Sequence, residues 1–336
     1  MSVVIPVYCA EKTLIQCLNS ICAQTLKDFE IICVDDGSTD NSLDILNTYA
    51  SKDRRFHILH QENQGAGVAR NLGLSYATGK YVVFLDADDY FMPRLLELAY
   101  KKAEATCSDI VLYAAKQYNQ EKNVSFLAPW ILKTKCLPWK KCFSADEVAD
   151  VLFQITTPEP WSKMFRLDFI RRENLHFQAL KNANDVFFVY TALALARRIS
   201  YIKQPLLFYR VNQKSSLQSN KASAPTNFVD AFLALREELS LCNIFEKFQA
   251  SFLKAVQANC CYHFRTISIN ALDLTQRKEI LKQLGIPLKY VNIKPDISDN
   301  NSIQHKIKSF FRCFREHGMR YALTLAIISV KTKTKG

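Results

Sequence analysis

Strand and helix patterns alternate along the first 115 residues of the chain, with short connections between them. Short apolar runs typical of buried strands cover Val3–Val7, Phe29–Val34, Phe56–Leu59, Tyr81–Leu85 and Ile110–Ala114. Between them, apolar residues recur at helical spacing over Thr13–Gln24, Ser42–Tyr49, Ala66–Tyr76 and Pro93–Ala105. Strands that follow one another through a helix pair in parallel, so this alternation predicts an α/β fold with a mostly parallel sheet flanked by helices.

The pattern changes after the fifth strand. It is irregular from Lys116 to Pro160, and it then predicts helices over Phe165–Arg171 and Val186–Ala196 and a strand over Leu206–Arg210. Beyond Ala224 the pattern is nearly all helical, with long amphipathic stretches over Phe228–Leu241 and Phe245–Phe264. We therefore expect a first domain over residues 1–218 and a helical, basic C-terminal region over residues 219–336.

Charge is distributed unevenly along the chain. The net charge is +12, yet residues 1–114 hold 10 Lys/Arg against 15 Asp/Glu, and the last 36 residues hold 8 basic residues against one acidic residue. A uniformly basic surface would favour nucleic acid as a partner, and this distribution does not. An acidic first part with a basic tail instead favours a carboxylate-rich site joined to a segment that anionic lipid attracts.

The basic tail also carries apolar residues at helical spacing, at Ile303, Ile307, Phe310, Phe311 and Phe314. This pattern predicts a helix that lies in a membrane interface, and the alternative is a surface helix that packs on the rest of the protein. No apolar stretch is long enough to span a bilayer, no signal peptide precedes the first strand, and the 11 cysteines form no C-x-x-C motif. We therefore expect a cytoplasmic protein that binds the inner face of the cytoplasmic membrane peripherally.

Polar clusters follow three of the predicted strands. They are Tyr8-Cys9-Ala10-Glu11, Asp35-Asp36-Gly37-Ser38 and Asp86-Ala87-Asp88-Asp89. Ligand sites in sheets of this kind lie at the carboxyl ends of the strands. The three clusters therefore predict one ligand site at that edge of the sheet.

The cluster at residues 86–89 places three carboxylates at one strand end. Such carboxylates repel one another unless a cation joins them. Hard divalent ions take oxygen ligands, and Mg²⁺ often binds one or two carboxylates together with substrate phosphates. We therefore expect Mn²⁺ or Mg²⁺ and a diphosphate here, whereas an Asp-rich turn that caps the following helix is the alternative.

Two further segments favour a nucleotide ligand. Gly37 permits a left-handed turn and residues 38–40 can cap the next helix, but capping does not require both Asp35 and Asp36. Asp36 could therefore accept a hydrogen bond from a base N–H, such as that of uracil. Further along, two glycines precede the helix at Ala66, where the helix start and Arg70 could approach a phosphate or hold the aspartates.

Four motifs in this order and spacing resemble the family 2 glycosyltransferases of GT-A fold, a Rossmann-like α/β fold. They are Val4-Ile5-Pro6-Val7-Tyr8, Val34-Asp35-Asp36-Gly37-Ser38, Asn63-Gln64-Gly65 with Ala69-Arg70-Asn71, and Phe84-Leu85-Asp86-Ala87-Asp88-Asp89. The resemblance implies that a nucleotide-sugar donor is bound by residues in or beside the four motifs, namely Pro6, Tyr8, Glu11, Asp36, Arg70, Asp86 and Ala87. It also implies that Asp36 contacts uracil, that Asp86 lies near the ribose and that Asp88 holds the metal.

The resemblance implies a general base as well. The family's base lies in a Glu-Asp pair that heads a helix, and Asn184-Asp185 occupies that place here. Asp185 is then the catalytic base and Asn184 departs from the family pattern, whereas an ordinary first-turn residue is the alternative for Asp185. The segment with Trp161 and Lys163 resembles one that shapes the acceptor pocket, to which Asn184 would also belong. The strand Leu206–Arg210, followed by Ser215 and Ser216, resembles a late strand and loop that can close over the diphosphate, and a core strand with a polar loop is the alternative.

Together these observations predict an inverting glycosyltransferase. The expected donor is a UDP-linked hexose or N-acetylhexosamine, and the expected acceptor is a hydroxyl of a growing surface glycan such as lipopolysaccharide, capsule or a lipid-linked oligosaccharide. A Rossmann oxidoreductase is disfavoured because the G-x-G-x-x-G fingerprint is absent. A sugar nucleotidyltransferase and a non-catalytic scaffold that binds nucleotide-sugars are the alternatives.

Overall fold

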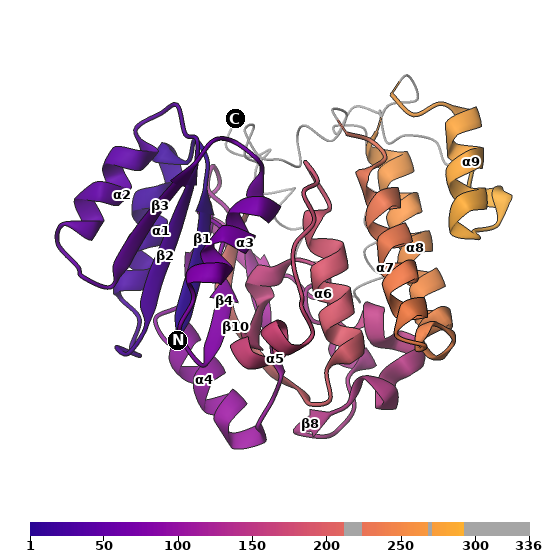
Figure 1. Ribbon diagram of the computed structural model, residues 1–336, viewed down its shortest axis with the longest axis horizontal. Coiled ribbons are helices and arrows are strands. Elements are labelled where there is room, and N and C mark those ends of the chain that lie inside the picture. Colours follow the sequence, from indigo (N-terminus) through magenta and orange to yellow (C-terminus); the bar gives the residue numbers. More distant parts are fainter. Residues whose placement is uncertain (212–223, 268–270, 292–336) are drawn as a thin grey trace, which may run out of the picture.

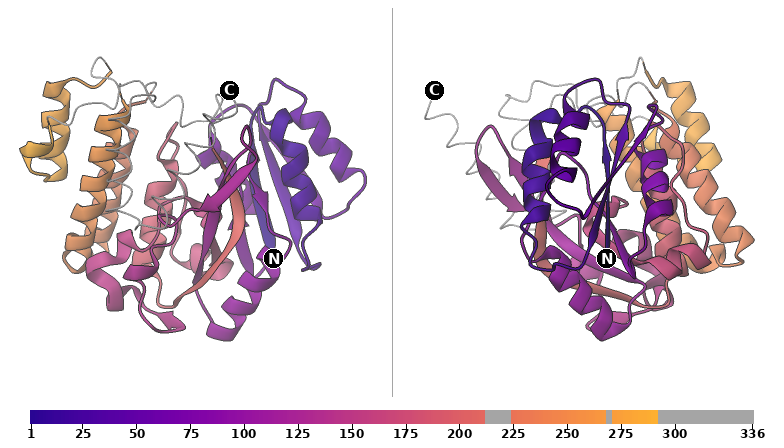
Figure 2. Two further views of the ribbon diagram at one scale, coloured as in Figure 1. Left: turned by 180° about the vertical axis from the view of Figure 1, so that it is seen from behind. Right: turned by 60° about the vertical axis from the view of Figure 1, so that its left-hand side comes forward.

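A mixed β-sheet runs through the molecule, and helices cover both of its faces (Figures 1 and 2). The structure is a computed structural model that describes residues 1–211, 224–267 and 271–291. Its strands are β1 (Ser2–Val7), β2 (Glu30–Asp36), β3 (Phe56–Gln61), β4 (Tyr81–Phe84), β5 (Tyr90–Phe91), β6 (Ile110–Asn119), β7 (Val124–Leu127), β8 (Cys142–Phe143), β9 (Lys163–Arg166) and β10 (Ile199–Val211). Its α-helices are α1 (Glu11–Cys22), α2 (Ser42–Ala50), α3 (Ala66–Tyr76), α4 (Leu95–Thr106), α5 (Leu167–Arg172), α6 (Asn184–Leu195), α7 (Asn227–Leu241), α8 (Phe245–Thr266) and α9 (Leu274–Leu284). Short 3₁₀ helices are η1 (Thr134–Cys136), η2 (Ala145–Gln154), η3 (Pro160–Ser162) and η5 (Leu288–Tyr290).

The first four strands of the sheet are parallel, as their alternation with helices predicts. Hydrogen-bonded neighbours follow the order β3-β2-β1-β4-β9-β6-β10-β5, with β7 beside β6 and β8 beside β10. β1 pairs in parallel with both β2 and β4, and β2 pairs in parallel with β3. The predicted α/β fold with a mostly parallel sheet and flanking helices is therefore confirmed. Because β1 lies between β2 and β4, the loops after these three strands leave the same edge of the sheet side by side.

The helix predicted over Phe165–Arg171 is wrong at its start. Residues Lys163–Arg166 form β9, which lies antiparallel between β4 and β6, and α5 begins only at Leu167. Phe165 is fully buried and lies opposite Val82 on one side and Ile110 on the other. These cross-strand contacts outweigh the local helical pattern, because strand formation depends on packing against neighbours.

Both faces of the sheet are buried. In β1, Val3, Ile5 and Val7 share one hydrophobic cluster with residues of α1 and α4, whereas Val4 belongs to a second cluster with residues of α3, α5 and α6. Alternate side chains of a strand point to opposite faces. A strand that is covered on both sides therefore has a continuous apolar run and not an alternating one, which explains the sequence pattern of β1.

The C-terminal helices continue the second of these clusters outward from the sheet. In Figure 1, α7 and α8 lie beyond α6, and α9 is farther out still. Phe228 and Phe232 of α7 and Phe248 of α8 belong to the same buried cluster as Val4 of β1. Among the described helices, none has both the length and the hydropathy of a membrane span. The expected boundary at residue 218 and the basic tail lie outside the described residues.

Candidate active site

The loops that follow β1 and β2 are joined by hydrogen bonds. The backbone N–H of Glu11 donates to Asp40 Oδ2 (3.1 Å), and Glu11 Oε2 accepts from the backbone and side-chain amides of Asn41 (3.2 and 3.0 Å). Pro6 is half-buried near the end of β1, and Tyr8, with 53% of its surface exposed, lies at the rim of the two loops. Glu11 therefore stabilises the loops against each other, and Tyr8 is free to meet a ligand.

Asp36, at the end of β2, organises the turn before α3. It is only 2% exposed. Its Oδ1 accepts from Gln61 Nε2 (2.7 Å) and from the N–H of Gln64 (2.9 Å), and its Oδ2 accepts from the N–H of Gly65 (2.8 Å). Gly65 has a φ of 90°, a conformation that favours glycine. Since an ionised carboxylate accepts about four hydrogen bonds, Asp36 has room for about one further donor.

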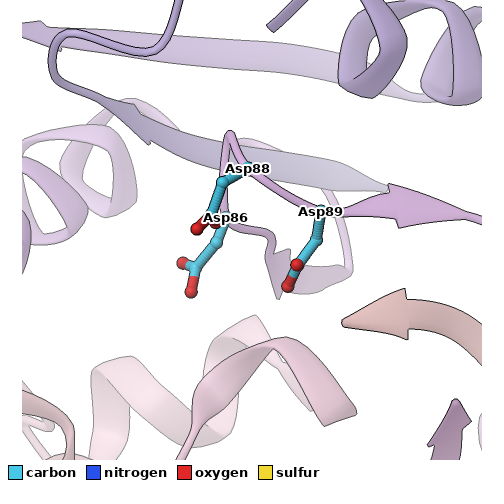
Figure 3. A group of neighbouring side chains, drawn as sticks. All are labelled: Asp86, Asp88 and Asp89. Atoms are coloured by element: carbon cyan, nitrogen blue, oxygen red, sulfur yellow. The ribbon is translucent and has the colours of Figure 1, made fainter. Parts of the chain in front are cut away.

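The three aspartates after β4 lie together in the turn that leads to β5 (Figure 3). One carboxylate oxygen from each of Asp86, Asp88 and Asp89 lies within 4.8 Å of the others, and the carboxylates of Asp86 and Asp88 lie next to each other. Burial, and after it the charge of Asp86, raises the pKa of Asp88 to about 6. Burial also raises the pKa of Asp89 well above its ordinary value. The turn therefore concentrates negative charge in a place with little water to screen it.

Arg210, near the end of β10, holds this acidic turn in place. Its backbone N–H donates to Asp89 Oδ1 (2.8 Å), and its Nε donates to the carbonyl oxygen of Asp88 (2.7 Å). Its terminal nitrogens donate to Gln120 (2.5 Å) and to Gln16 of α1 (2.8 Å). Arg210 is 3% exposed, so it anchors the turn from inside the protein. Asp89 Oδ2 remains buried without a hydrogen-bond partner among the described residues.

Arg70 joins the acidic turn to the start of α6. It is 6% exposed, and it donates to Asp86 Oδ1 (2.7 Å) and to Asn184 Oδ1 (3.0 Å). The approach of α3 to this region depends on Gly67, where a β-carbon would overlap the carbonyl oxygen of Gln178. Asn184, which departs from the family's acidic pattern, thus serves as an uncharged partner of Arg70.

Asp185 follows in the first turn of α6, next to this contact. Burial, and after it the charge of Glu159, raises its pKa to about 7 against the opposing charge of Arg70. A carboxyl group that titrates near neutral pH is suited to accept a proton in a reaction and to release it afterwards. Asp185 therefore has the electrostatic character of a general base.

The three side chains expected in an acceptor pocket are buried. Trp161 is 2% exposed, Asn184 is 5% exposed and Lys163 is fully buried. The ammonium group of Lys163 donates to the backbone carbonyl oxygens of Thr157 and Glu159 (both 2.7 Å). These side chains could therefore shape a pocket only from beneath its surface.

The acidic turn fits a hard divalent cation. It offers closely spaced carboxylate oxygens, one of them buried without a partner in the described part of the chain. Burial together with like charge disfavours the ionised carboxylates in the absence of a cation. Carboxylates from a single turn occupy only part of the coordination sphere of Mg²⁺ or a similar ion. Water and phosphate oxygens can complete it.

Sequence patterns indicated the acidic turn but not the residue that holds it. Arg210 lies in a predicted strand. A charged residue in an otherwise apolar strand was the one sequence signal that could have drawn attention to it. Its partners on α1 and in the acidic turn are far from it in the chain, so local patterns do not reveal them. Ser215 and Ser216, expected to close over a diphosphate, lie outside the described residues.

Residues 2–177 match the family model described as Glycosyl transferase family 2. This match covers more than half of the chain. The chain is a family 2 glycosyltransferase. The resemblance noted in the four sequence motifs is thereby confirmed.

Relatives of this glycosyltransferase include bacterial sugar transferases. The Bacillus subtilis (strain 168) protein EpsH is 34% identical over 223 residues, which are 65% of this chain and 62% of EpsH. The poly(ribitol-phosphate) beta-glucosyltransferase of Bacillus spizizenii is 28% identical over 320 residues, which are 93% of this chain and 48% of that enzyme. The chain thus spans less than two thirds of the length of these relatives.

Solved structures share the fold of this glycosyltransferase. S. aureus TarS 1–349 in complex with UDP-GlcNAc matches with a TM-score of 0.66 and 21% identity over 99% of this chain and 91% of TarS 1–349. The mannosyltransferase PcManGT from Pyrobaculum calidifontis, in complex with GDP-Man and Mn²⁺, matches with a TM-score of 0.53 and 17% identity over 86% of this chain and 84% of PcManGT. At these identities the likeness establishes the GT-A fold.

Proposed function

We propose that this glycosyltransferase moves a sugar from a nucleotide-sugar donor to a hydroxyl group with inversion at the anomeric carbon. The observation that carries the proposal is the position of Arg70, which bridges Asp86 and Asn184. Through this bridge the acidic turn and Asp185, the residue after Asn184, would serve one reaction centre. A single displacement there needs one base and no nucleophile from the protein.

In the proposed reaction, Asp185 accepts the proton of the acceptor hydroxyl while the hydroxyl oxygen attacks the anomeric carbon. The bond between that carbon and the diphosphate oxygen breaks, and the nucleoside diphosphate leaves with the bonding electrons. The pKa of Asp185, about 7, supports this role, because a base works best when its pKa lies near the working pH.

Asp88, with Asp86 beside it, would hold Mn²⁺ or Mg²⁺. A divalent ion bound there would neutralise charge on the departing diphosphate. Arg70, which already pairs with Asp86, would orient that carboxylate toward the donor. The Mn²⁺ complex of the mannosyltransferase PcManGT supports a metal, as does the spacing of the carboxylates.

For the donor, we propose a UDP-linked hexose or N-acetylhexosamine. The UDP-GlcNAc complex of TarS and the glucosyltransferase relative support this class of donor. The exposed Tyr8 and the neighbouring Pro6 would contact the nucleotide, with Glu11 supporting their loop. Asp36 would use its remaining acceptor position for the base N–H, and Ala87 would line the path between ribose and metal.

For the acceptor, we propose a growing surface glycan such as lipopolysaccharide, capsule or a lipid-linked oligosaccharide. A relative named for transfer of glucose to poly(ribitol phosphate) supports a polymeric acceptor. We further propose that residues 1–218 carry the chemistry and that the basic region within residues 219–336 holds the enzyme at the inner face of the cytoplasmic membrane.

Release of UDP tests the proposal. The enzyme is incubated with Mn²⁺ and a panel of UDP-sugars, with glycan acceptors, and the anomeric configuration of the product is read by NMR. Asp185→Asn should bind UDP like the wild type but release it at least about 100-fold more slowly, the usual scale of general-base catalysis. Asp168→Asn removes an exposed first-turn aspartate from α5 and is the matched control. Retained configuration, or wild-type turnover by Asp185→Asn, would contradict the mechanism.

A further inference from the structure

The acidic turn at residues 86–89 closes on itself by a backbone hydrogen bond. The N–H of Asp89 donates to the carbonyl oxygen of Asp86 (3.2 Å). Within this turn, one carboxylate oxygen from each of Asp86, Asp88 and Asp89 lies within 4.8 Å of the others (Figure 3). Like charges at such separations repel, so in the absence of a cation the repulsion favours a wider turn. Contacts from outside the turn must therefore hold the carboxylates close together.

The side chain of Arg210 provides such contacts to the backbone of the turn. Its Nε donates to the carbonyl oxygen of Asp88 (2.7 Å), and its terminal nitrogens donate to the amide oxygens of Gln16 on α1 (2.8 Å) and of Gln120 directly after β6 (2.5 Å). A guanidinium is planar, and its N–H groups point in fixed directions. Acceptors from three separate segments therefore fix its plane and, with it, the backbone position of Asp88.

Helix α1 also contacts the other end of the turn. The thiol of Cys17, the residue after Gln16, donates to the carbonyl oxygen of Asp86 (3.7 Å). The turn is thus held between α1 and β10, with the Arg210 guanidinium as the link between them.

These contacts of the Arg210 side chain use none of the carboxylate oxygens that could bind a metal. Its acceptors are a backbone carbonyl oxygen and two amide oxygens, all of them uncharged. Arg70 differs in this respect, because it pairs with Asp86 Oδ1 (2.7 Å). The backbone N–H of Arg210 does donate to Asp89 Oδ1 (2.8 Å), but a substitution that changes only the side chain retains this bond.

We infer that Arg210 is a positioning residue for the metal, whose side chain holds the acidic turn closed so that Asp86 and Asp88 can share one cation. The inference rests on the proposed metal site in this turn. Without the guanidinium, repulsion between the carboxylates is free to widen the turn, and a cation must close it again on binding. Loss of a group that orients metal ligands typically lowers metal affinity about 10–100-fold.

Geometry and charge predict opposite effects of removing this side chain. A buried guanidinium beside the turn repels a cation, so loss of its charge alone would strengthen metal binding. Loss of the hydrogen bonds that fix the turn would weaken it. The direction of the change in affinity therefore shows which of the two contributions Arg210 makes.

Binding of Mn²⁺ to the full-length protein without nucleotide tests the inference. Free Mn²⁺ is measured by its EPR signal, and Kd follows from the titration. In Arg210→Met, Kd should rise about 10–100-fold. Arg210→Lys keeps the charge but has a single ammonium group in place of the planar fork, so it should also bind Mn²⁺ more weakly than the wild type. An unchanged or lower Kd in Arg210→Met overturns the inference.

Arg54→Met is the matched control for this titration. Arg54 is exposed and lies just before β3, at the edge of the sheet opposite the acidic turn. Its replacement should leave the Kd for Mn²⁺ at the wild-type value.

The dependence of the rate on Mn²⁺ concentration gives a readout that general damage to the fold would not produce. In Arg210→Met the half-saturating Mn²⁺ concentration should rise by the same factor as Kd. At saturating Mn²⁺, kcat should return toward the wild-type value, because the metal itself then closes the turn. A kcat that stays low at saturating Mn²⁺ would mean damage beyond metal binding, and that result also overturns the inference.

Asp88→Asn separates failure of the inference from failure of the proposed metal site. Weaker Mn²⁺ binding in Asp88→Asn together with wild-type binding in Arg210→Met overturns the inference alone. Wild-type Mn²⁺ binding by Asp88→Asn overturns the proposed site and the inference with it. Should Arg210→Met fold poorly, Gln16→Ala combined with Gln120→Ala removes two acceptors of the guanidinium at exposed positions. Kd should then rise in the same direction, and an unchanged Kd in this double variant overturns the inference.

Discussion

At the scale of single residues, the acidic turn lowers the stability of the fold as long as no cation is bound to it. The ordinary pKa of an aspartate is about 3.9, and burial and the charge of Asp86 raise the pKa of Asp88 to about 6. Between these pH values the native state binds more protons than the unfolded state, so stability falls as pH rises through this window. At neutral pH the ionised turn is therefore unfavourable until a cation binds.

This balance predicts opposite effects of Asp88→Asn with and without metal. In EDTA at pH 7 the variant should unfold at a higher temperature than the wild type, because a repelling charge is removed. With excess Mn²⁺ the wild type should gain about 2.7 kcal/mol at a metal concentration near 100 times Kd, and the variant should gain little. Thermal unfolding followed by fluorescence measures both effects.

Asp44→Asn is the control for this experiment, because Asp44 is an exposed aspartate on α2 away from the turn. It should leave both unfolding temperatures and the response to Mn²⁺ unchanged. Equal stabilisation of wild type and Asp88→Asn by Mn²⁺ would place the metal elsewhere. Full turnover in EDTA would contradict a metal role of the acidic turn altogether.

At the scale of elements, the site depends on how closely α3 approaches the start of α6. Gly67 is buried on α3, and a β-carbon there would meet the carbonyl oxygen of Gln178 and lie 3.0 Å from Cβ of Asn184. Arg70, one turn further along α3, reaches Asn184 and Asp86 from this position. Gly67 thus sets the distance between α3 and the start of α6, and this distance fixes the position of Arg70.

Gly67→Ala should therefore lower activity more strongly than its effect on stability alone would explain. Overpacking at a tight contact typically costs about 1–3 kcal/mol. Displacement of α3 should also break the Arg70 bridge and lower kcat by at least about tenfold, since misplacement of catalytic groups by about 1 Å can cost about 100-fold. Urea unfolding and UDP release measure the two effects.

Gly285→Ala serves as the control for stability alone. Gly285 ends α9 with a φ of 72° and has open space around a β-carbon. An alanine there should cost about 1 kcal/mol through backbone strain and leave kcat unchanged. If both variants lose activity in proportion to stability, Gly67 has no special role in the site.

At the scale of the whole molecule, the helical C-terminal region and the sheet share one core. Residues of α7, α8 and α9 belong to the same buried cluster as residues of β1, β2 and α6. The proposed boundary at residue 218 therefore separates two functions, chemistry before it and membrane attachment after it. It does not separate two independently folding domains.

The uneven charge of the chain leads to a prediction for the tail. Each basic residue near an anionic surface contributes about 1 kcal/mol, so deletion of residues 302–336 should abolish binding to anionic vesicles. Salt should weaken binding of the intact protein, because it screens such contacts. Co-sedimentation with phosphatidylglycerol vesicles measures this, and phosphatidylcholine vesicles are the control. If the full-length protein does not bind anionic vesicles at low salt, the tail has a structural role and not a membrane-binding one.

Local sequence patterns were sufficient to predict the parallel part of the sheet and the edge at which the site lies. β1, β2, β3 and β4 are short apolar runs separated by helical patterns, and both signals are local properties of the chain. Parallel neighbours place their carboxyl ends at one edge, so the polar clusters after β1, β2 and β4 had to come together. The candidate metal site followed from three aspartates within four residues, which need no tertiary contact to be found.

How these groups are held, and how acidic they are, depends on contacts between segments that are distant in the chain. Local patterns placed Phe165 in a helix, whereas pairing with β4 and β6 made it part of a strand. The bridges of Arg70 to Asn184 and of Arg210 to Asp89 join residues far apart in the chain. The affinity of a carboxylate for protons depends on burial and on neighbouring charge. Both arise only when distant segments pack together, so no local pattern contains them.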